Sequence, residues 1–564
     1  AHMNTSNPLL TLTDSGKTKI KNLDQLHMNG EWLGSGTLIE NANGIDFESY
    51  TSKLGRTGEK TETIIDKDGT TKIGYKGYQF KGARAPQTEG TDIWGGRSVL
   101  GNTTTDNEIT LSGNHTGKKA YGGWTSGTGS TATGENAQNH SIGNKITLTG
   151  AGSEVHHMTG GATNIAGGKA TGNHAILSDG RVTGNLTGGS ATNGEVSGNT
   201  VEINGGRVDF LTYGGVTGGT GTAKNNKVTL TNGTVHSDIY GGVASSGAAT
   251  GNKVYIKGGS TTNHDVYGGF STNGDTTGNT VDITGGSVRD IYGGNTTSGN
   301  ATGNTVTIKG NGGTVQNITG GRSNSGNATG NTVNLGDGTA DFTTGITGTI
   351  SGGNGATVGK DYLTGNTLNV YDNVQATNIS NFAAINFRFN QYVTKTDSFL
   401  KLTDAGVTAI RSLNDLYLHG EHGHKGTLIE KTGAGGTIDI ADGQNRLAKT
   451  EETKESVFAK SSDNKKITYE SYTFKGATTP TTDVDGTNKD IFGGRSILGN
   501  TTTQNTITVS DADTYRNVYG GWTSGSGTTA SNKDSSTGNK VTVKGSANVT
   551  GTVYGGFTDV AGGN

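Results

Sequence analysis

Four tyrosines that each precede a pair of glycines are the residues of this sequence best suited to contact a ligand. Tyr213, Tyr240, Tyr267 and Tyr292 follow one another at intervals of 27, 27 and 25 residues. Equal spacing predicts that their rings form a ladder over four successive structural repeats. Such a ladder has two interpretations, which the sequence leaves open: the rings cover and stabilise a sheet, or they bind a sugar or a protein.

A second constellation combines aromatic rings with arginine and occurs twice. An arginine beside aromatic rings either binds a polar ligand or makes a cation–π contact within the protein. Its members are Trp94, Arg97 and Trp124, and then Phe492, Arg495 and Trp522. Both constellations are candidate ligand-binding sites.

Catalytic chemistry has less support in the sequence. Enzymes that cleave acidic polysaccharides need clustered aspartates for calcium binding or acid–base work, together with a basic residue. Asp265, Asp282 and Asp290 are expected in different repeats or on different faces. We therefore expect no catalytic residue, and a polysaccharide-degrading enzyme is the alternative function.

Two short motifs resemble metal sites but have simpler interpretations. His156 and His157 are adjacent, and neighbouring strand residues are expected on opposite faces, where they cannot share a metal. Residues 66–69, Asp-Lys-Asp-Gly, resemble the start of a calcium loop without its later ligands, so a hairpin turn is expected there. No metal and no cofactor is predicted.

Composition limits the architecture that could hold these residues. The chain has 564 residues, of which 100 are Gly, 3 are Pro and none is Cys, and 29% are hydrophobic. So few apolar residues predict a thin core or disorder, but disorder would not preserve a repeat. With 45 basic and 48 acidic residues and no dense basic run, nucleic acid is an unexpected partner. No stretch approaches the ~20 apolar residues of a membrane span.

The glycine pairs recur with a nearly constant period. The position before each pair is occupied by Trp94, Tyr121, Thr159, Thr187, Tyr213, Tyr240, Tyr267, Tyr292, Thr319 and Ser351. Between the pairs lies Gly-Asn-Thr-Val-Thr-Ile or a variant, with its asparagine at Asn199, Asn226, Asn252, Asn279, Asn304 and Asn331. Each repeat thus holds two short β-prone runs separated by turns, and no helical periodicity.

Alternation within the runs assigns an inside and an outside. Asn279, Val281 and Ile283 are expected on the buried face, whereas Thr280 and Asp282 face outward. One repeat of 27 residues cannot offset its own conformational entropy, so repeats must stack. We predict an all-β fold, a right-handed parallel β-helix of about 27 residues per coil, with asparagine ladders inside and glycine at corners that need positive φ. A β-sandwich, the competing fold, rarely keeps so constant a period.

A longer repeat divides the chain into two modules. Residues 36–40 return unchanged at 426–430, and residues 101–105 return at 499–503. Within each module an irregular, charged opening precedes regular coils. Residues 50–78 and 449–472 of these openings are predicted to project from the solenoid or to cap it. The openings are also predicted to carry ligand specificity. The predicted domains are 4–90 (first opening), 91–393 (coils), 394–488 (second opening) and 489–564 (coils of the second module).

The repeated Gly-Asn-Thr-Val-Thr-Ile coils and the absence of Cys resemble the passenger region of type V autotransporters, as does the Asn-Phe…Asn-Phe segment at residues 381–387. The resemblance implies an adhesin segment on the surface of a Gram-negative-type bacterium, or secreted, that binds host or bacterial glycans or proteins. Some relatives are proteases with Gly-Asp-Ser-Gly, whereas residues 13–16 here read Thr-Asp-Ser-Gly. The chain is expected to be a monomeric fragment without its export signal and anchor, because it stops inside a repeat.

Overall fold

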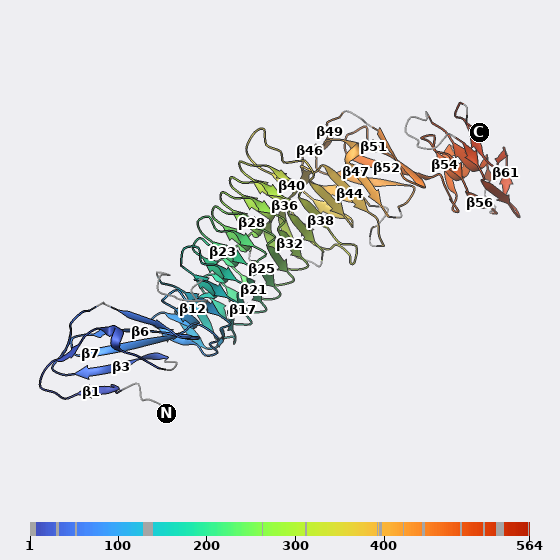
Figure 1. Ribbon diagram of the computed structural model, residues 1–564. Helices are drawn as coiled ribbons and strands as arrows, with labels where there is room; N and C mark the ends of the chain where they lie inside the picture. The colour runs from blue at the N-terminus through green and yellow to red at the C-terminus, as the bar shows by residue number, and fades with distance from the viewer. Residues whose placement is uncertain are drawn as a thin grey trace. The chain divides into compact units, whose positions relative to one another are not determined.

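The chain is built almost entirely of β-strands that form stacked coils (Figure 1). The computed structural model describes residues 7–29, 33–50, 53–127, 139–261, 263–310, 313–391, 393, 397–420, 422–442, 446–485, 488–510, 514–525, 535–561 and 563–564. The start of the first predicted domain (residues 4–6) and of the third (394–396) lies outside these residues. Two compact units, residues 1–368 and 369–564, divide the chain. The prediction of an all-β solenoid with parallel coils of about 27 residues is confirmed.

Each regular coil contributes strands to three parallel sheets. One sheet takes a strand of two residues, the second a strand of four, and the third a short strand followed by a longer one that contains the glycine pair. Each strand pairs in register with its equivalent in the next coil, so that Tyr213 is the partner of Tyr240 and Val201 of Val228. Equivalent residues therefore form columns that run from coil to coil.

The sheets of the first unit have the following members. The first sheet holds β10 (Thr104–Thr105), β13 (Ser141–Ile142), β16 (Ala170–Thr171), β20 (Val196–Ser197), β24 (Ala223–Lys224), β28 (Ala249–Thr250), β31 (Thr276–Thr277), β34 (Ala301–Thr302) and β37 (Ala328–Thr329). The second sheet holds β11 (Glu108–Leu111), β14 (Lys145–Leu148), β17 (His174–Leu177), β21 (Thr200–Ile203), β25 (Lys227–Leu230), β29 (Lys253–Ile256), β32 (Thr280–Ile283), β35 (Thr305–Ile308) and β38 (Thr332–Leu335). The third sheet holds β8 (Gln87–Glu89), β9 (Asp92–Ser98), β12 (Asn114–Thr125), β15 (Glu154–Thr163), β18 (Arg181–Val182), β19 (Leu186–Ala191), β22 (Arg207–Val208), β23 (Thr212–Thr217), β26 (Thr234–Val235), β27 (Ile239–Ala244), β30 (Val266–Ser271), β33 (Val288–Thr296), β36 (Thr314–Ser323), β39 (Gly345–Ile346) and β40 (Thr349–Asn354).

The core is a thin column of aliphatic side chains and asparagines. Val281 and Asn279 are fully buried and Ile283 is almost so, whereas Thr280 and Asp282 are half-exposed. The predicted inside and outside of this strand are therefore confirmed. The same alternation recurs in the four-residue strands of the other regular coils, which is why each coil buries its apolar side chains only when it is stacked.

The predicted asparagine ladder is present inside the first unit. From Asn107 to Asn331, each ladder Nδ2 donates to the Oδ1 of the asparagine in the next coil, at 2.7–3.2 Å. The same Nδ2 also donates to a backbone carbonyl, as Asn226 does to Val196 O at 3.0 Å. These bonds satisfy amides that are fully buried, and burial without partners would be costly.

Glycine has two different roles in each coil. The residue before a ladder asparagine has positive φ, 63° at Gly198 and 65° at Gly251, as predicted for a corner. The glycine pair instead provides space. A Cβ added to Gly189 would lie 2.2 Å from Cγ of Asn199, and one on Gly188 would lie 2.4 Å from the carbonyl oxygen of Gly214.

The first opening contains an antiparallel sheet of β3 (Gly34–Asn41), β7 (Lys72–Gln79), β6 (Thr61–Asp68) and β5 (Leu54–Thr57), to which β1 (Leu10–Leu12) adds in parallel, and a separate parallel pair of β2 (Thr18–Ile20) with β4 (Ile45–Phe47). It also contains the 3-10 turn η1 (Leu23–Gln25). Asp68 pairs with Lys72 across the turn that joins β6 to β7, so the hairpin predicted at residues 66–69 is confirmed.

A buried carboxylate joins this opening to the first coil. Glu62 of β6 is fully buried and accepts hydrogen bonds from Ser98 Oγ (2.8 Å), Asn102 Nδ2 (2.7 Å) and the backbone N–H groups of Val99 and Leu100. Burial raises the pKa of Glu62, and these donors oppose the rise. The network fixes the hairpin on the end of the stack.

The second unit repeats this construction. Glu455 is buried and accepts from Ser496 Oγ (2.9 Å), Asn500 Nδ2 (2.7 Å) and Ile497 N–H (2.5 Å). Its elements are β42 (Val374–Ala376), β43 (Asn378–Ser380), β44 (Ala384–Arg388), β45 (Leu400–Leu402), β46 (Val407–Ile410), η3 (Leu413–Asp415), β47 (Leu416–His419), β48 (Lys425–Lys431), β49 (Thr437–Ile440), β50 (Arg446–Thr450), β51 (Lys454–Lys460), β52 (Lys466–Thr473), β53 (Thr481–Asp485), β54 (Asn488–Ser496), β55 (Thr502–Thr503), β56 (Thr506–Val509), β57 (Thr514–Tyr515), β58 (Val518–Thr523), β59 (Ser536–Thr537), β60 (Lys540–Val543), β61 (Asn548–Val549), β62 (Val553–Tyr554) and β63 (Phe557–Thr558); β41 (Thr367–Val370) spans the boundary between the units.

Candidate functional site

The four predicted tyrosines form a continuous stack on the outer face of the third sheet. Ring centroids lie 5.4 Å apart between Tyr213 and Tyr240, 4.7 Å between Tyr240 and Tyr267, and 5.0 Å between Tyr267 and Tyr292, with interplanar angles of 21°, 4° and 9°. The ladder forms because the strands pair in register, which places the four side chains in one column on the outer face of the sheet. Its role in ligand binding stays a prediction.

Two of the four tyrosine hydroxyl groups are hydrogen-bonded to carboxylates. Tyr240 Oη donates to Asp238 at 3.2 Å and Tyr267 Oη donates to Asp265 at 3.1 Å. Burial, followed by the nearby carboxylates, raises the pKa of both phenols, so they remain neutral donors. This tyrosine ladder (Tyr213, Tyr240, Tyr267 and Tyr292) stabilises its own surface.

Asp265 and Asp290 lie in different coils, as expected, but they are stacked rather than scattered. The register places Asp238, Asp265 and Asp290 in one column, two residues before the tyrosines. Asp282 belongs to another sheet, as expected. Each carboxylate of the column is used inside the solenoid: Asp238 Oδ1 accepts from the Asp265 N–H at 3.0 Å, and Asp290 Oδ1 accepts from the Asn317 N–H at 3.1 Å. Arg289 also donates to Asp265, at 2.7 Å.

The first arginine cluster is filled by its own side chains. The Arg97 guanidinium lies 4.1 Å from the ring centroid of Trp94, 4.9 Å from Trp124 and 5.1 Å from Tyr78, and it donates to Glu89 at 2.7 Å. Trp94 is 2% exposed, because Arg97 covers its ring and β8 pairs with its strand. The cation–π interpretation therefore accounts for this arginine.

The second arginine cluster has the same arrangement. Arg495 lies 4.6 Å from the ring centroid of Phe492, 5.0 Å from Trp522 and 5.2 Å from Tyr472, and donates to Asp483 at 3.0 Å. Phe492 is 1% exposed. Ligand binding at either cluster stays a prediction, and in the first cluster Trp94 and Trp124 each line a cavity.

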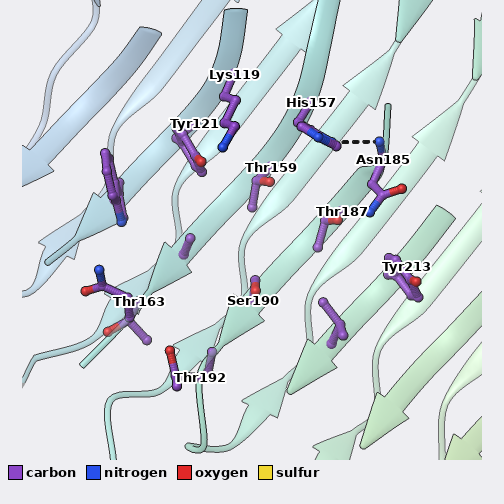
Figure 2. A pocket seen from close by; sticks show the side chains of 15 residues that line it. Lys119, Tyr121, His157, Thr159, Thr163, Asn185, Thr187, Ser190, Thr192 and Tyr213 are labelled. Atoms are coloured by element: carbon purple, nitrogen blue, oxygen red, sulfur yellow. Dashed lines mark hydrogen bonds between the residues drawn. The ribbon is translucent and has the colours of Figure 1, made fainter. Parts of the chain in front are cut away.

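The tyrosine ladder ends at a groove in the same face, which the sequence analysis missed (Figure 2). On β15 and β19 the two outward positions around the glycine pair hold small residues, Thr159 with Ala162 and Thr187 with Ser190. Larger residues occupy the equivalent positions on the neighbouring strands β12 and β23, and the hollow between them has a volume of about 510 Å³. Its end walls are Tyr121 with Trp124 and Tyr213 with Val216. We call this hollow the two-coil groove.

One side of the two-coil groove carries nitrogen-containing side chains. Lys119, His157 and Asn185 occupy one column of equivalent positions. Farther along the sheet, beside the tyrosine ladder, the same column is occupied by aspartates. The Asn185 N–H donates to His157 Nδ1 at 2.9 Å, which leaves the His157 proton on Nε2 (Figure 2). Burial, then the neighbouring His156 and Lys119, lowers the pKa of His157, so the ring is neutral at pH 7.

The expectation that His156 and His157 point to opposite faces is wrong. Their ring centroids lie 4.1 Å apart and both side chains are partly exposed. The large apolar side chains that β15 buries are Val155 and Met158, three positions apart, because the strand bends between its pairings with β18 and β19. Two successive residues therefore face outward. Among the described residues, no group of three or more His, Cys, Asp or Glu side chains could hold a metal ion.

The comparisons with known proteins add no relative. No family model, no curated protein and no solved structure matches the chain. Among the described residues, no helix is long and apolar enough to cross a membrane. Functional arguments for this chain therefore depend on its own geometry.

Proposed function

We propose that this chain is a non-catalytic binding and stalk segment of a bacterial cell-surface adhesin, which recognises glycans or proteins on host or bacterial surfaces. The observation that carries the proposal is the two-coil groove. It combines aromatic end walls with hydroxyl and amide groups on an open face, which is the usual composition of a site for a polar ligand with apolar faces. A regular stack of coils is also a suitable spacer, because each coil contacts only its neighbours and length can be added without a new core.

The proposal extends to the family and the location. We infer an autotransporter passenger, displayed by a Gram-negative-type bacterium, from the resemblance of the Gly-Asn-Thr-Val-Thr-Ile coils. The asparagine ladder gives that motif a structural reason, since its Asn is the buried ladder residue and its Val and Ile are the core residues. Absence of Cys suits a chain that is exported unfolded through an oxidising compartment.

The alternative, a polysaccharide-degrading enzyme, is favoured by one observation. Asp238, Asp265 and Asp290 are stacked beside tyrosine hydroxyl groups, and stacked acids on a β-solenoid could perform acid–base chemistry. Against this, each carboxylate accepts backbone or side-chain hydrogen bonds that hold neighbouring coils together. We therefore assign them to the scaffold.

One experiment separates the two functions. The chain is immobilised and exposed to a panel of acidic and neutral glycans and to intact host and bacterial cells, and the supernatants are assayed for new reducing or unsaturated sugar ends. We expect retention without product release. Release of new ends, abolished by Asp265→Asn, would support the enzyme instead, and retention of neither glycans nor cells would contradict an adhesin.

The prediction that the module openings carry specificity is better tested by a point substitution than by deleting part of an opening. Removing the β6–β7 hairpin would also remove Glu62 and so open the first coil. Asp68→Lys, at the exposed tip of the hairpin, changes the charge of the opening without touching that network. Altered binding in this variant, with an intact groove, would locate specificity in the opening.

A further inference from the structure

The two-coil groove is a gap in an otherwise aromatic column. On the ladder side, Tyr213 stacks on Tyr240, while its strand pairs on the other side with β19, which carries Thr187. At the far end, Tyr121 is stacked on Trp124 and its strand pairs with β15, which carries Thr159. Both end walls therefore present rings to a space where two aromatic side chains are missing.

The length of this gap matches two sugar rings. Tyr121 and Tyr213 are three strand positions apart, which is roughly 14 Å at ~4.8 Å per strand. Within the tyrosine ladder one ring occupies each coil, at 4.7–5.4 Å between centroids. A pyranose ring is about as thick as one such step, and its C–H face packs on an aromatic ring as apolar surface does. Two linked rings would restore a continuous stack.

The floor of the groove offers hydroxyl groups that the protein does not use. Thr159 and Thr187 are 8% and 6% exposed, and both line the groove (Figure 2). Within the described chain, neither Oγ1 has a hydrogen-bond partner. A hydroxyl group both donates and accepts, so these two are available to a ligand that does the same. Sugar hydroxyl groups do both.

The charge of the groove favours anionic ligands over neutral and cationic ones. Lys119 and the His157 Nε2–H lie along one side, and no Asp or Glu is among the described residues that line the hollow. Asp92 on β9 is the register partner of Lys119 but does not line the hollow, and Lys119 Nζ forms no ion pair with a carboxylate in the described part of the chain. In the same column beside the tyrosine ladder stand Asp238, Asp265 and Asp290. An anion is thus attracted to the groove and repelled from the ladder.

We propose that the two-coil groove binds a two-ring unit of an anionic glycan, with the sugar rings stacked between Tyr121 and Tyr213, hydroxyl groups on Thr159 and Thr187, and a carboxylate or sulfate on Lys119. This inference rests on the proposed function and specifies its ligand class. Sugar carboxylates and sulfates present the same charge to Lys119, so the experiment includes both.

The decisive variant fills the gap. Thr187→Tyr introduces at this position the residue that Tyr213 and Tyr240 already place in the same column, so the coil is expected to accommodate it. Thr319→Tyr makes the same change in the same column at the other end of the ladder, next to Tyr292, and is the matched control. Lys119→Gln removes the cation alone.

Binding is measured by titrating the full chain with a hyaluronan tetrasaccharide, a chondroitin sulfate tetrasaccharide, 3′-sialyllactose and neutral lactose, with tryptophan fluorescence as the readout because Trp124 lines the groove. At least one anionic sugar should bind tenfold or more tightly than lactose. Thr187→Tyr should weaken this binding at least tenfold, Thr319→Tyr should leave it unchanged, and Lys119→Gln should abolish the preference over lactose.

The outcomes separate this inference from the proposed function. Glycan binding that survives Thr187→Tyr would overturn the groove assignment while the adhesin proposal stands. Equal binding of lactose and the anionic sugars, or no effect of Lys119→Gln, would overturn the anionic ligand class. Failure of the wild-type chain to bind any of the four sugars would overturn the inference, and cell retention would then decide the proposed function.

Discussion

The two-coil groove and the tyrosine ladder lie on the same sheet and share the same scaffold, yet one is hollow and the other is filled. Both have the glycine pair, both lie over the asparagine ladder, and both continue the same register from strand to strand. Only the outward side chains differ: Thr and Ser with Lys, His and Asn in the groove, Tyr with Asp in the ladder. The buried positions thus fix the coil, and the outward positions are free to carry different surface chemistry.

The largest effect should come from breaking the scaffold under the ladder. Val281 is fully buried between Val254 and Val306. Val281→Asp would bury an unpaired charge between coils, at a cost on the order of 4 kcal/mol. Urea and thermal unfolding measure the loss. Thr280→Asp places the same charge on the outer face and should change the free energy of unfolding by less than about 0.5 kcal/mol; equal losses would contradict the division into buried and outward positions.

Removing one rung of the asparagine ladder should have the next largest effect. Asn226→Ala deletes its bonds to Val196 O and Asn252 Oδ1. It also leaves the backbone N–H of Asn199 and one of the two Nδ2 hydrogens of Asn199 without an acceptor, while the other Nδ2 hydrogen keeps its bond to Ala170 O. We expect a loss of about 3 kcal/mol, because each unsatisfied buried group costs about 1–3 kcal/mol.

The control for this change is Asn204→Ala, an exposed asparagine outside the ladder. It should unfold at the same urea concentration as the wild type. Because each coil contacts only its neighbours, hydrogen exchange should locate the damage of Asn226→Ala to the adjacent coils. A uniform loss over the whole first unit would mean that the coils unfold as one block.

Interrupting the tyrosine ladder should cost less. Tyr240→Ser removes two ring stacks, and a stacked pair contributes about 0.5–1.5 kcal/mol beyond buried area, so we expect a loss of about 1–3 kcal/mol. Tyr255, an outward tyrosine on β29 of the same coil, is the comparison, since no ring stacks on it within the described chain. If Tyr255→Ser costs as much as Tyr240→Ser, the stacking does not stabilise the ladder.

The smallest effect concerns pH and distinguishes the groove from the ladder directly. In the groove the Asn185 N–H donates to His157 Nδ1, whereas in the ladder the Asp265 N–H donates to Asp238 Oδ1. The pKa of His157 is lowered by burial, so its contribution to stability is present above the unfolded pKa of ~6.5 and is lost as pH falls through the folded pKa.

Between pH 7 and pH 5 the Asn185 amide should therefore lose protection in hydrogen exchange, after correction for the intrinsic rate, by up to about tenfold, which is ~1.4 kcal/mol. The Asp265 amide should keep its protection. In His157→Gln the pH dependence at Asn185 should vanish. Parallel changes at both amides would point to a general loosening of the stack rather than to His157.

The period of the sequence was sufficient to predict the coils and the asparagine ladder. Equivalent positions must stack when a repeat can bury its core only against copies of itself. The period was insufficient at His156 and His157, where the strand bends and strict alternation fails. The aspartate column was missed although Asp238, Asp265 and Asp290 are spaced like the tyrosines, by 27 and 25 residues.

The groove was missed for a different reason. Thr159 and Thr187 were recognised as members of the column, but they were interpreted as substitutions for tyrosine rather than as a gap. Two small residues in succession among large ones are the signal that could have revealed it. The roles of Lys119 and Asn185 had no signal in the sequence, since they line the groove only through the registers of β12 with β15 and of β15 with β19.

All the amides of the asparagine ladder point the same way. From Asn107 to Asn331 each Nδ2 donates to the asparagine of the following coil, and from Asn144 to Asn366 each Oδ1 accepts from the preceding one. The dipoles therefore add rather than cancel, and every bond polarises the next. The stack therefore has a direction: the ladder asparagine of a finished coil offers its N–H and Nδ2 donors to the Oδ1 of an asparagine in the next coil. Assembly of this protein can thus proceed as templated growth, in which each coil specifies the register of its successor.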